Sequence, residues 1–181
     1  MSELRVPVTD RDHSLGPQDA PVTLVEYGDF QCPYCGAAYP VVKQVLEQFE
    51  GDVRFVFRNF PLTEVHPEAL DAAQVAELAS THRQFWAAHD LLFEHQDELG
   101  YNLYLDICRR LRIDAQSLQE VLDDGRYVDA IRAEEEGGIR SGVNGTPTFF
   151  LNGLSVDGGA PDLVAAIERA LADDALPRRI S

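Results

Sequence analysis

The sequence predicts an α/β fold, in which a central mixed sheet flanked by helices is interrupted by an all-helical insertion. Three observations support this prediction: a strand–helix–strand pattern near the N-terminus, a long central stretch of helical periodicity, and a short strand pair before a final helix. A chain of 181 residues, 45% of them hydrophobic, is long enough for one well-buried core and short for two. We therefore expect a single domain that contains an insertion.

Residues 1–19 are predicted to form an extended N-terminal lead-in, with one short strand around residues 6–8. The segment mixes acidic residues with prolines, whereas a signal peptide needs a basic start and an apolar core. No apolar run approaches the roughly 20 residues that are needed to span a bilayer. We therefore expect a soluble, cytoplasmic protein without membrane insertion.

Residues 20–65 contain the strand–helix–strand pattern. Residues 21–27 are rich in β-branched and aliphatic side chains and are followed by a glycine, which predicts a buried strand ending in a turn. Apolar side chains at helical spacing predict a helix over residues 33–50, with Pro33 suited to its first turn, and alternation predicts a second strand over residues 52–59. The sequence CPYC therefore lies at the turn between the first strand and its helix.

Residues 66–137 are predicted to form the all-helical insertion, with four or five helices, because apolar residues recur at helical spacing throughout this stretch. The α/β pattern resumes over residues 138–176. Asn152 and Gly153 form a strong two-residue hairpin signal between two short strands, and a last helix follows. Residues 177–181 are expected to be a tail.

The CPYC sequence places Cys32 and Cys35 one turn apart at the N-terminus of a predicted helix. Disulfide exchange needs a thiolate, and the free N–H groups and the dipole of a helix N-terminus lower the pKa of a cysteine there. We therefore expect Cys32 to be the attacking thiolate and Cys35 the resolving thiol of a dithiol–disulfide pair. A structural zinc site needs two more ligands, but only Cys108 remains and no histidine has a ligand-like spacing to it, so we expect no metal and no cofactor.

Glu26 is an acid in an otherwise apolar strand, six residues before Cys32. A buried, unpaired carboxylate is costly, so such a group usually has a raised pKa and keeps its proton. In that state Glu26 could accept or return the proton of Cys35 during disulfide exchange. The alternatives are a solvated Glu26 at a strand edge, or a Glu26 paired with a Lys or Arg.

Two further residues are expected to be structural. Cys108 lies one turn from Tyr104 and near Leu111 on a helical apolar stripe, which favours a core position over a second redox thiol. His66 precedes a proline at the start of the insertion, and its alternative role is a contact in a substrate groove.

These features in combination resemble the DsbA-like branch of the thioredoxin superfamily. The resemblance rests on CPYC after a strand, the upstream Glu26, the helical insertion and the sequence GVNGTPTFFLNG before the last helix. It covers about residues 20–172 and extends to bacterial thioredoxin-like domains, including those fused to sodium/proton antiporters. The resemblance implies a thioredoxin fold in which Cys32, Cys35 and Glu26 are the catalytic residues.

The resemblance also implies where a substrate would bind. Pro147 would be the cis-proline beside the disulfide, and Thr146 would offer backbone hydrogen bonds to a bound substrate segment, so that docking is partly strand addition. Pro33 and Tyr34, between the two cysteines, complete the expected substrate-binding residues.

The implied function is that of a protein disulfide oxidoreductase, which exchanges its disulfide with protein thiols. The pair between the cysteines is Pro-Tyr, where the periplasmic oxidase has Pro-His and glutaredoxins have Pro-Tyr, so the direction of electron flow stays open. A thioredoxin system, glutathione or a membrane oxidase could recycle the pair. A net charge of −16 argues against a nucleic-acid partner.

Two alternatives to this function remain open. The first is a glutathione transferase or isomerase of the kappa-like branch, whose members typically carry Ser where Cys32 stands. The second is a module that holds zinc or an iron–sulfur cluster through CPYC.

Overall fold

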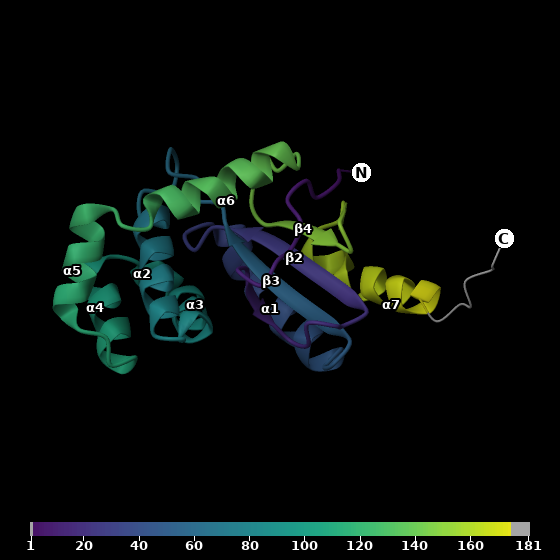
Figure 1. The fold of residues 1–181 in the computed structure, drawn as a ribbon, viewed down its shortest axis with the longest axis horizontal. Helices are drawn as coiled ribbons and strands as arrows, with labels where there is room; N and C mark the ends of the chain where they lie inside the picture. Colours follow the sequence, from purple (N-terminus) through teal and green to yellow (C-terminus); the bar gives the residue numbers. More distant parts are fainter. Residues whose placement is uncertain (1, 175–181) are drawn as a thin grey trace.

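The computed structural model describes residues 2–174 of the chain, so the expected tail lies outside the described residues. The strands are β1 (His13–Leu15), β2 (Val22–Gly28), β3 (Val53–Asn59), β4 (Thr148–Leu151) and β5 (Leu154–Ser155). The helices are α1 (Pro33–Gln48), α2 (Ala69–Thr81), α3 (Phe85–Glu94), α4 (Tyr101–Arg110), α5 (Ala115–Asp124), α6 (Val128–Arg140) and α7 (Leu163–Asp174). Two 3₁₀ turns, η1 (Gln96–Glu98) and η2 (Ala160–Asp162), complete the elements. The molecule is elongated, with the sheet toward one end and helices α2 to α5 at the other (Figure 1).

The sheet is mixed and has the strand order β1-β3-β2-β4-β5. Its central strand β2 pairs in parallel with β3, which precedes the insertion, and antiparallel with β4, which follows it. The predicted hairpin between β4 and β5 is confirmed, because Asn152 (φ 48°) and Gly153 (φ 86°) both adopt the left-handed conformation that a tight two-residue turn requires. The predicted α/β fold with an all-helical insertion is therefore confirmed.

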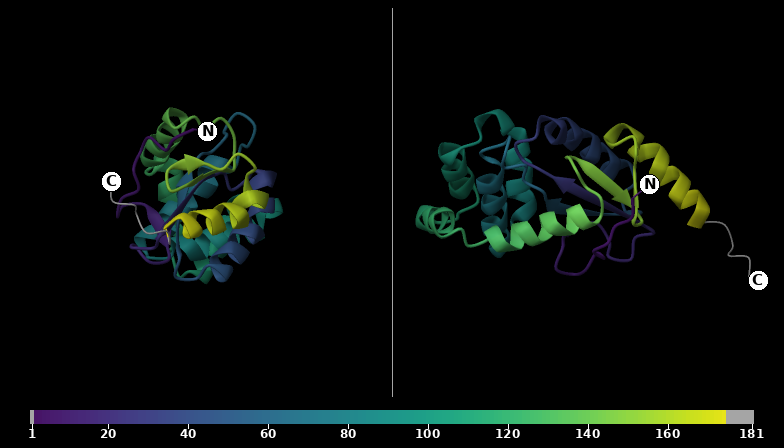
Figure 2. Two further views of the ribbon diagram at one scale, coloured as in Figure 1. Left: turned by 90° about the vertical axis from the view of Figure 1, so that its right-hand side faces the viewer. Right: turned by 90° about the horizontal axis from the view of Figure 1, so that it is seen from above.

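Helices cover both faces of the sheet (Figure 2). Helices α1 and α7 lie on one face, while α6 and the N-terminal segment lie on the other. Helix α6 approaches the sheet closely at Gly138, where a Cβ atom would lie only 2.8 Å from the ring of Phe60 and 3.0 Å from that of Tyr27. Helix α6 therefore continues through the glycine pair at residues 137 and 138, where the insertion was expected to end, and this pair lets the helix contact the sheet.

The N-terminal strand also lies elsewhere than expected. Residues 6–8 form no strand, and the edge strand is β1, which pairs antiparallel with β3. Pro7 has no N–H to donate, and the carbonyls of Val6 and Pro7 accept hydrogen bonds of 2.9 and 3.0 Å from Arg58 instead. A buried side chain therefore holds this segment in place of a backbone ladder.

The insertion contains five helices, α2 to α6, in agreement with the prediction of four or five. Cys108 is 1% exposed and belongs to the apolar core, as expected. Helix α3 packs its aromatic side chains against β3, so the core continues from the sheet into the insertion. Within residues 2–174, no helix combines the length and the apolar character that crossing a membrane requires.

Candidate active site

The CPYC sequence lies at the N-terminus of α1, as predicted. Cys32 is the last residue before the helix, with an extended backbone (φ −68°, ψ 121°), and Pro33 begins the helix. Both cysteines are free and buried, with exposed fractions of 2% for Cys32 and 0% for Cys35, so the structure shows the dithiol form. Tyr34, between them, is 74% exposed. The loop therefore presents an aromatic side chain to solvent next to two buried sulfurs.

The pKa of the Cys32 thiol is lowered to about 5. The main cause is the hydrogen bond from the thiol of Cys35 to the Cys32 sulfur. The backbone N–H groups of Tyr34 and Cys35 act in the same direction, and burial acts against it. These N–H groups are available because the first turn of a helix has no preceding carbonyls to accept them. Cys32 is therefore a thiolate at neutral pH.

The pKa of the Cys35 thiol is strongly raised, first by burial and then by its hydrogen bond to Cys32. The negative charge of Glu26 adds to this effect, and the backbone N–H of Asp29, 3.4 Å from the Cys35 sulfur, opposes it. Cys35 therefore keeps its proton at neutral pH. The two thiols differ in protonation although they lie one helical turn apart.

Glu26 lies on the central strand β2 and is 3% exposed. It has neither solvent nor, among the described residues, a Lys or Arg partner, so the solvated and ion-paired alternatives do not hold. Burial, and then the negative charge of the Cys32 thiolate, raise the pKa of the Glu26 carboxyl to about 8. A Cβ atom at Gly28 would collide with the ring of Phe57 and lie 3.2 Å from Glu26 Oε1, so the glycine leaves the room that the carboxyl occupies.

The Thr146–Pro147 peptide bond is cis. The Cys32 sulfur lies 3.3 Å from the carbonyl oxygen of Thr146, so this loop faces the nucleophile although it follows it by 114 residues. Pro33 is exposed, whereas Thr146 and Pro147 are half-buried. The structure thus brings all the expected substrate-binding residues to one place, and their role in binding stays a prediction.

Asp29 is a buried residue of this site that the sequence reasoning missed. Its Oδ1 accepts hydrogen bonds from the N–H groups of Gln31 (2.7 Å) and Cys32 (3.2 Å). Its Oδ2 accepts from the N–H of Leu62 (2.9 Å) and from Nδ1 of His66 (2.7 Å). A usable signal was present, because an Asp in a turn between a strand and a helix often accepts hydrogen bonds from the N–H groups that follow it. His66 therefore lies beside the active-site loop, held by the same carboxylate.

Gln96, in η1 of the insertion, is a second residue that the sequence reasoning missed. Its Nε2 donates hydrogen bonds to the carbonyls of Phe30 (2.7 Å) and Cys32 (2.9 Å). A Cβ atom at Gly36 would collide with the Gln96 amide, so the glycine after Cys35 makes this contact sterically possible. No sequence signal could have found Gln96, because the contact joins elements more than 60 residues apart.

Among residues 2–174, no group of three or more His, Cys, Asp or Glu side chains is arranged to hold a metal ion. The polar groups around the cysteines include backbone N–H groups and the two buried acids Glu26 and Asp29.

The two cysteines at the start of α1, facing a cis-proline loop, lie in a thiol–disulfide oxidoreductase-like fold. The sequence matches the thioredoxin family over residues 8–169. The chain belongs to this family, and it shares its fold with solved structures that include an alpha-DsbA1.

Three similar proteins illustrate the match. The Na(+)/H(+) antiporter NhaA 1 of Salinispora arenicola is 46% identical over 180 residues, which cover 98% of this chain and 28% of that protein. BdbD of Bacillus subtilis, in its oxidised form, superposes with a TM-score of 0.83 at 25% identity and covers 94% of this chain and 98% of its own. Alpha-DsbA1 of Wolbachia pipientis has a TM-score of 0.79 at 20% identity, over 94% and 95% of the two chains. The chain thus spans 28% of the length of this curated relative, and nearly the full length of the two solved structures.

Proposed function

We propose that this chain is a protein thiol–disulfide oxidoreductase, in which Cys32 forms the mixed disulfide with the substrate. The observation that carries the proposal is the split between the two thiols: the pKa of Cys32 is lowered to about 5, whereas that of Cys35 is raised. Only one of the two sulfurs is then a nucleophile at neutral pH, and the other keeps its proton until the mixed disulfide is resolved.

In the oxidising direction, the exchange consists of two successive attacks by substrate thiolates. A substrate thiolate attacks the sulfur of Cys32, the Cys32–Cys35 bond breaks, and Cys35 leaves as a thiolate that takes a proton from Glu26. A second substrate thiolate then attacks the substrate sulfur of the mixed disulfide, which releases the Cys32 thiolate and the substrate disulfide. The substrate is oxidised by two electrons, and the pair is reduced to the dithiol.

We further propose that the pair acts mainly as an electron acceptor, that is, as an oxidant of protein thiols. A stabilised thiolate stabilises the reduced pair, and each unit by which its pKa falls raises the potential of the pair by about 30 mV. A thioredoxin-type cysteine has a pKa of about 7 and a potential of about −270 mV, so a pKa of about 5 corresponds to about −210 mV or above. The expected potential therefore lies between about −210 and −120 mV.

The surface around Cys32 supports protein thiols as the substrates. Tyr34 is strongly exposed beside the nucleophile, and the backbone at Thr146 and Pro147 is positioned to pair with an extended substrate segment. The recycling partner and the cytoplasmic location expected from the sequence stay predictions.

The test is the equilibrium reduction potential of the pair in glutathione buffers, followed by Cys32 alkylation against pH. We expect a potential above about −210 mV and half-maximal alkylation near pH 5. The variant Cys32→Ser should lose all exchange, and Cys35→Ser should trap mixed disulfides. A potential near −270 mV would overturn the oxidising direction, whereas exchange by Cys32→Ser would overturn the proposed function itself. Metal analysis and glutathione calorimetry of freshly purified protein separate the cluster-binding and kappa-like alternatives.

A further inference from the structure

A small cavity lies behind the active site, between β2, α1 and α3. Glu26 and His89 both line it, together with the apolar side chains of Val42, Phe55 and Phe93. Its volume is about 10 Å³, which is about the space that one water molecule needs. The cavity therefore joins the buried acid of the active site to a buried histidine of the insertion.

His89 has one satisfied and one unsatisfied ring nitrogen. Its Nδ1 lies 3.0 Å from Oδ1 of Asp90, and because a carboxylate can only accept, Nδ1 carries the hydrogen. Burial lowers the pKa of the imidazole, so the ring is neutral and Nε2 is a free acceptor. Nε2 is buried and has no hydrogen-bond partner within the part of the chain that the structure describes, although His89 is only 4% exposed. A buried acceptor without a donor is uncommon in a folded protein.

Glu26 supplies what His89 lacks. A buried carboxyl that keeps its proton is a donor, and the side chain of Glu26 makes no hydrogen bond with another described residue. The side chains of a protonated acid and a neutral imidazole thus line the same cavity, which has room for one bridging water. Asp90 and Lys43 line the same cavity. Asp90 is 30% exposed and pairs with Lys43 at 2.8 Å, so this end of the cavity reaches solvent.

We propose that His89 is a positioning and proton-relay residue for Cys35: it connects Glu26, through one water in the cavity, to Asp90 and the solvent. This inference rests on the proposed function. It assigns a role in catalysis to the helical insertion, because α3 supplies both His89 and Asp90.

The relay moves the proton of Cys35 to solvent in three transfers. When Cys35 attacks Cys32 in a mixed disulfide, the bond from Cys32 to the substrate breaks and the substrate sulfur leaves with the electron pair. Glu26 passes its proton through the water to Nε2 of His89, and the resulting carboxylate takes the proton of Cys35. The Nδ1 hydrogen of His89 passes to Asp90 and then to solvent. Reduction of the pair runs the same transfers in reverse and restores the first tautomer of His89.

The charged and titratable groups around His89 are consistent with this role. They are Glu26 on β2, Tyr39 and Lys43 on α1, His13 on β1 and Asp90 on α3 itself. Only Asp90 makes a direct hydrogen bond to the ring among the described residues, and it fixes the tautomer that leaves Nε2 free. The remaining neighbours of His89 are the aromatic rings of Phe30, Phe57, Phe85, Trp86 and Phe93, which cannot take a proton from it.

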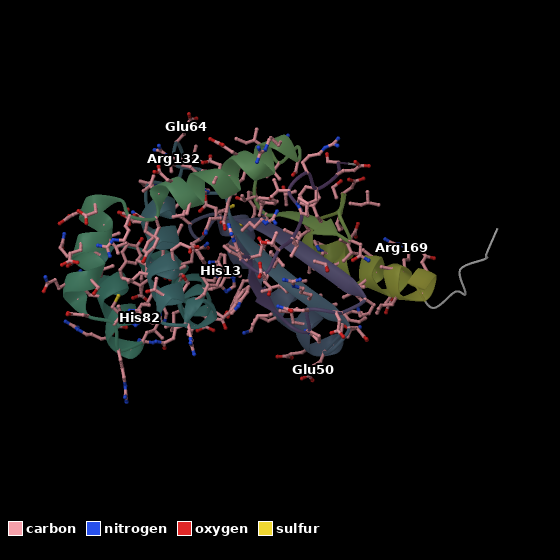
Figure 3. All side chains as sticks on the ribbon, viewed as in Figure 1. His13, Glu50, Glu64, His82, Arg132 and Arg169 are labelled. Carbon is pink, nitrogen blue, oxygen red and sulfur yellow. The ribbon has the colours of Figure 1, made fainter. Side chains whose placement is uncertain are left out.

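The experiment separates the two steps of exchange by stopped flow, with oxidised glutathione as the probe. Attack of Cys32 releases the first glutathione, and resolution by Cys35 releases the second. The variants are His89→Gln, which keeps a polar side chain but cannot relay a proton, and His89→Phe, which suits the aromatic surroundings if Gln does not fold. Asp90→Asn removes the carboxylate that accepts the proton at the solvent end of the relay. The matched control is His82→Gln, an exposed histidine on the insertion and far from the sheet (Figure 3).

We expect resolution to slow about tenfold or more at pH 7 in both His89 variants, and less in Asp90→Asn. The first step and the pH dependence of Cys32 alkylation should not change, and the rates of variant and parent should converge at high pH, where solvent base replaces the relay. A merely structural role would change both steps together. An unchanged resolution rate, or a parallel loss of both steps, overturns the relay. Absence of both steps in the parent protein overturns the proposed function as well.

Discussion

Two ionisable side chains are buried on neighbouring strands of the sheet, and they differ in their hydrogen-bond partners. Arg58 on β3 is 3% exposed and donates hydrogen bonds to both carboxylate oxygens of Asp12, to the hydroxyl of Tyr27, and to the carbonyls of Val6 and Pro7. Glu26 on β2 is equally buried and has no such partner among residues 2–174. One group is fully satisfied and the other is not.

The difference follows from what each group does. The network of Arg58 lies on the face covered by α6 and ties the N-terminal segment to the sheet, and a satisfied buried ion pair of this kind can be purely structural. Glu26 faces α1, beneath the cysteines, where a fixed partner would hold it ionised and end its exchange of protons. A buried ionisable group without a partner therefore marks the face of this sheet that we propose to be functional.

The largest expected effect on stability comes from replacing Arg58, whose N–H groups all donate hydrogen bonds. Arg58→Met should lower the free energy of unfolding by about 3 to 5 kcal/mol, because it leaves the carboxylate of Asp12 buried without its cation. Denaturant unfolding measures this loss. Arg132→Met, at an exposed arginine of α6, should change stability by less than about 0.5 kcal/mol. The reduction potential should be the same in both variants, and a shifted potential in Arg58→Met would contradict the separation of the two faces.

Glu26→Gln should raise the free energy of unfolding, whereas Arg58→Met lowers it. The folded carboxyl keeps a proton that the unfolded chain loses above pH 4.5, so stability of the parent falls as pH rises from 4.5 to about 8. At pH 7 the variant should be more stable by roughly 3 kcal/mol, at about 1.36 kcal/mol for each pH unit above 4.5. Unfolding curves at pH 4.5 and pH 7 test this, since the gain should vanish at the lower pH. Exposed Glu50→Gln is the control, and equal stability of Glu26→Gln at both values would refute the buried-acid assignment.

A smaller effect on stability is expected from the ionisation of Cys32. The thiolate of Cys32 stabilises the reduced fold fully above its unfolded pKa near 9, and this contribution is lost as pH falls through the folded pKa of about 5. The advantage of the reduced over the oxidised protein should therefore narrow by about 1 to 2 kcal/mol between pH 7 and pH 5, because solvent screens part of the full effect. Paired unfolding curves of the two redox forms measure it. A constant difference would mean that Cys32 is not a thiolate in the folded protein.

The smallest effect is expected at Gln96, a polar group whose donor is satisfied although it lies at the functional face. Gln96→Ala removes the hydrogen bonds to the carbonyls of Phe30 and Cys32 and should cost about 1 kcal/mol. Exposed Gln44→Ala on α1 should be neutral. If Gln96→Ala cost as much as Arg58→Met, the division into a structural and a functional face would need revision.

Much of the fold follows from local pattern. The strand–helix–strand unit and the β4–β5 hairpin were predictable because periodicity and the Asn152–Gly153 pair act over a few residues. The buried Glu26 was predictable for the same reason, as one acid in an apolar strand.

The remaining features depend on contacts that periodicity does not encode. The predicted strand at residues 6–8 was wrong because Arg58, 50 residues later, binds the carbonyls there. The close packing of the glycine pair of α6 against Tyr27 and Phe60 on the sheet was not predictable either. Gln96 and His89 join the site only because the insertion folds back on the sheet, and a linear pattern carries no trace of that.

The contact between Cys32 and the cis-proline loop can form only late in the synthesis of the chain. The cysteine is made 114 residues before the Thr146 carbonyl that faces it. At about 5 to 20 residues per second, a ribosome needs on the order of 6 to 23 s to synthesise that interval. Throughout this delay the nascent chain carries both sulfurs without the loop that later covers them. A newly made molecule is thus open to chance oxidation before it can catalyse anything, and a chain truncated before β4 would carry the reactive pair without its covering loop.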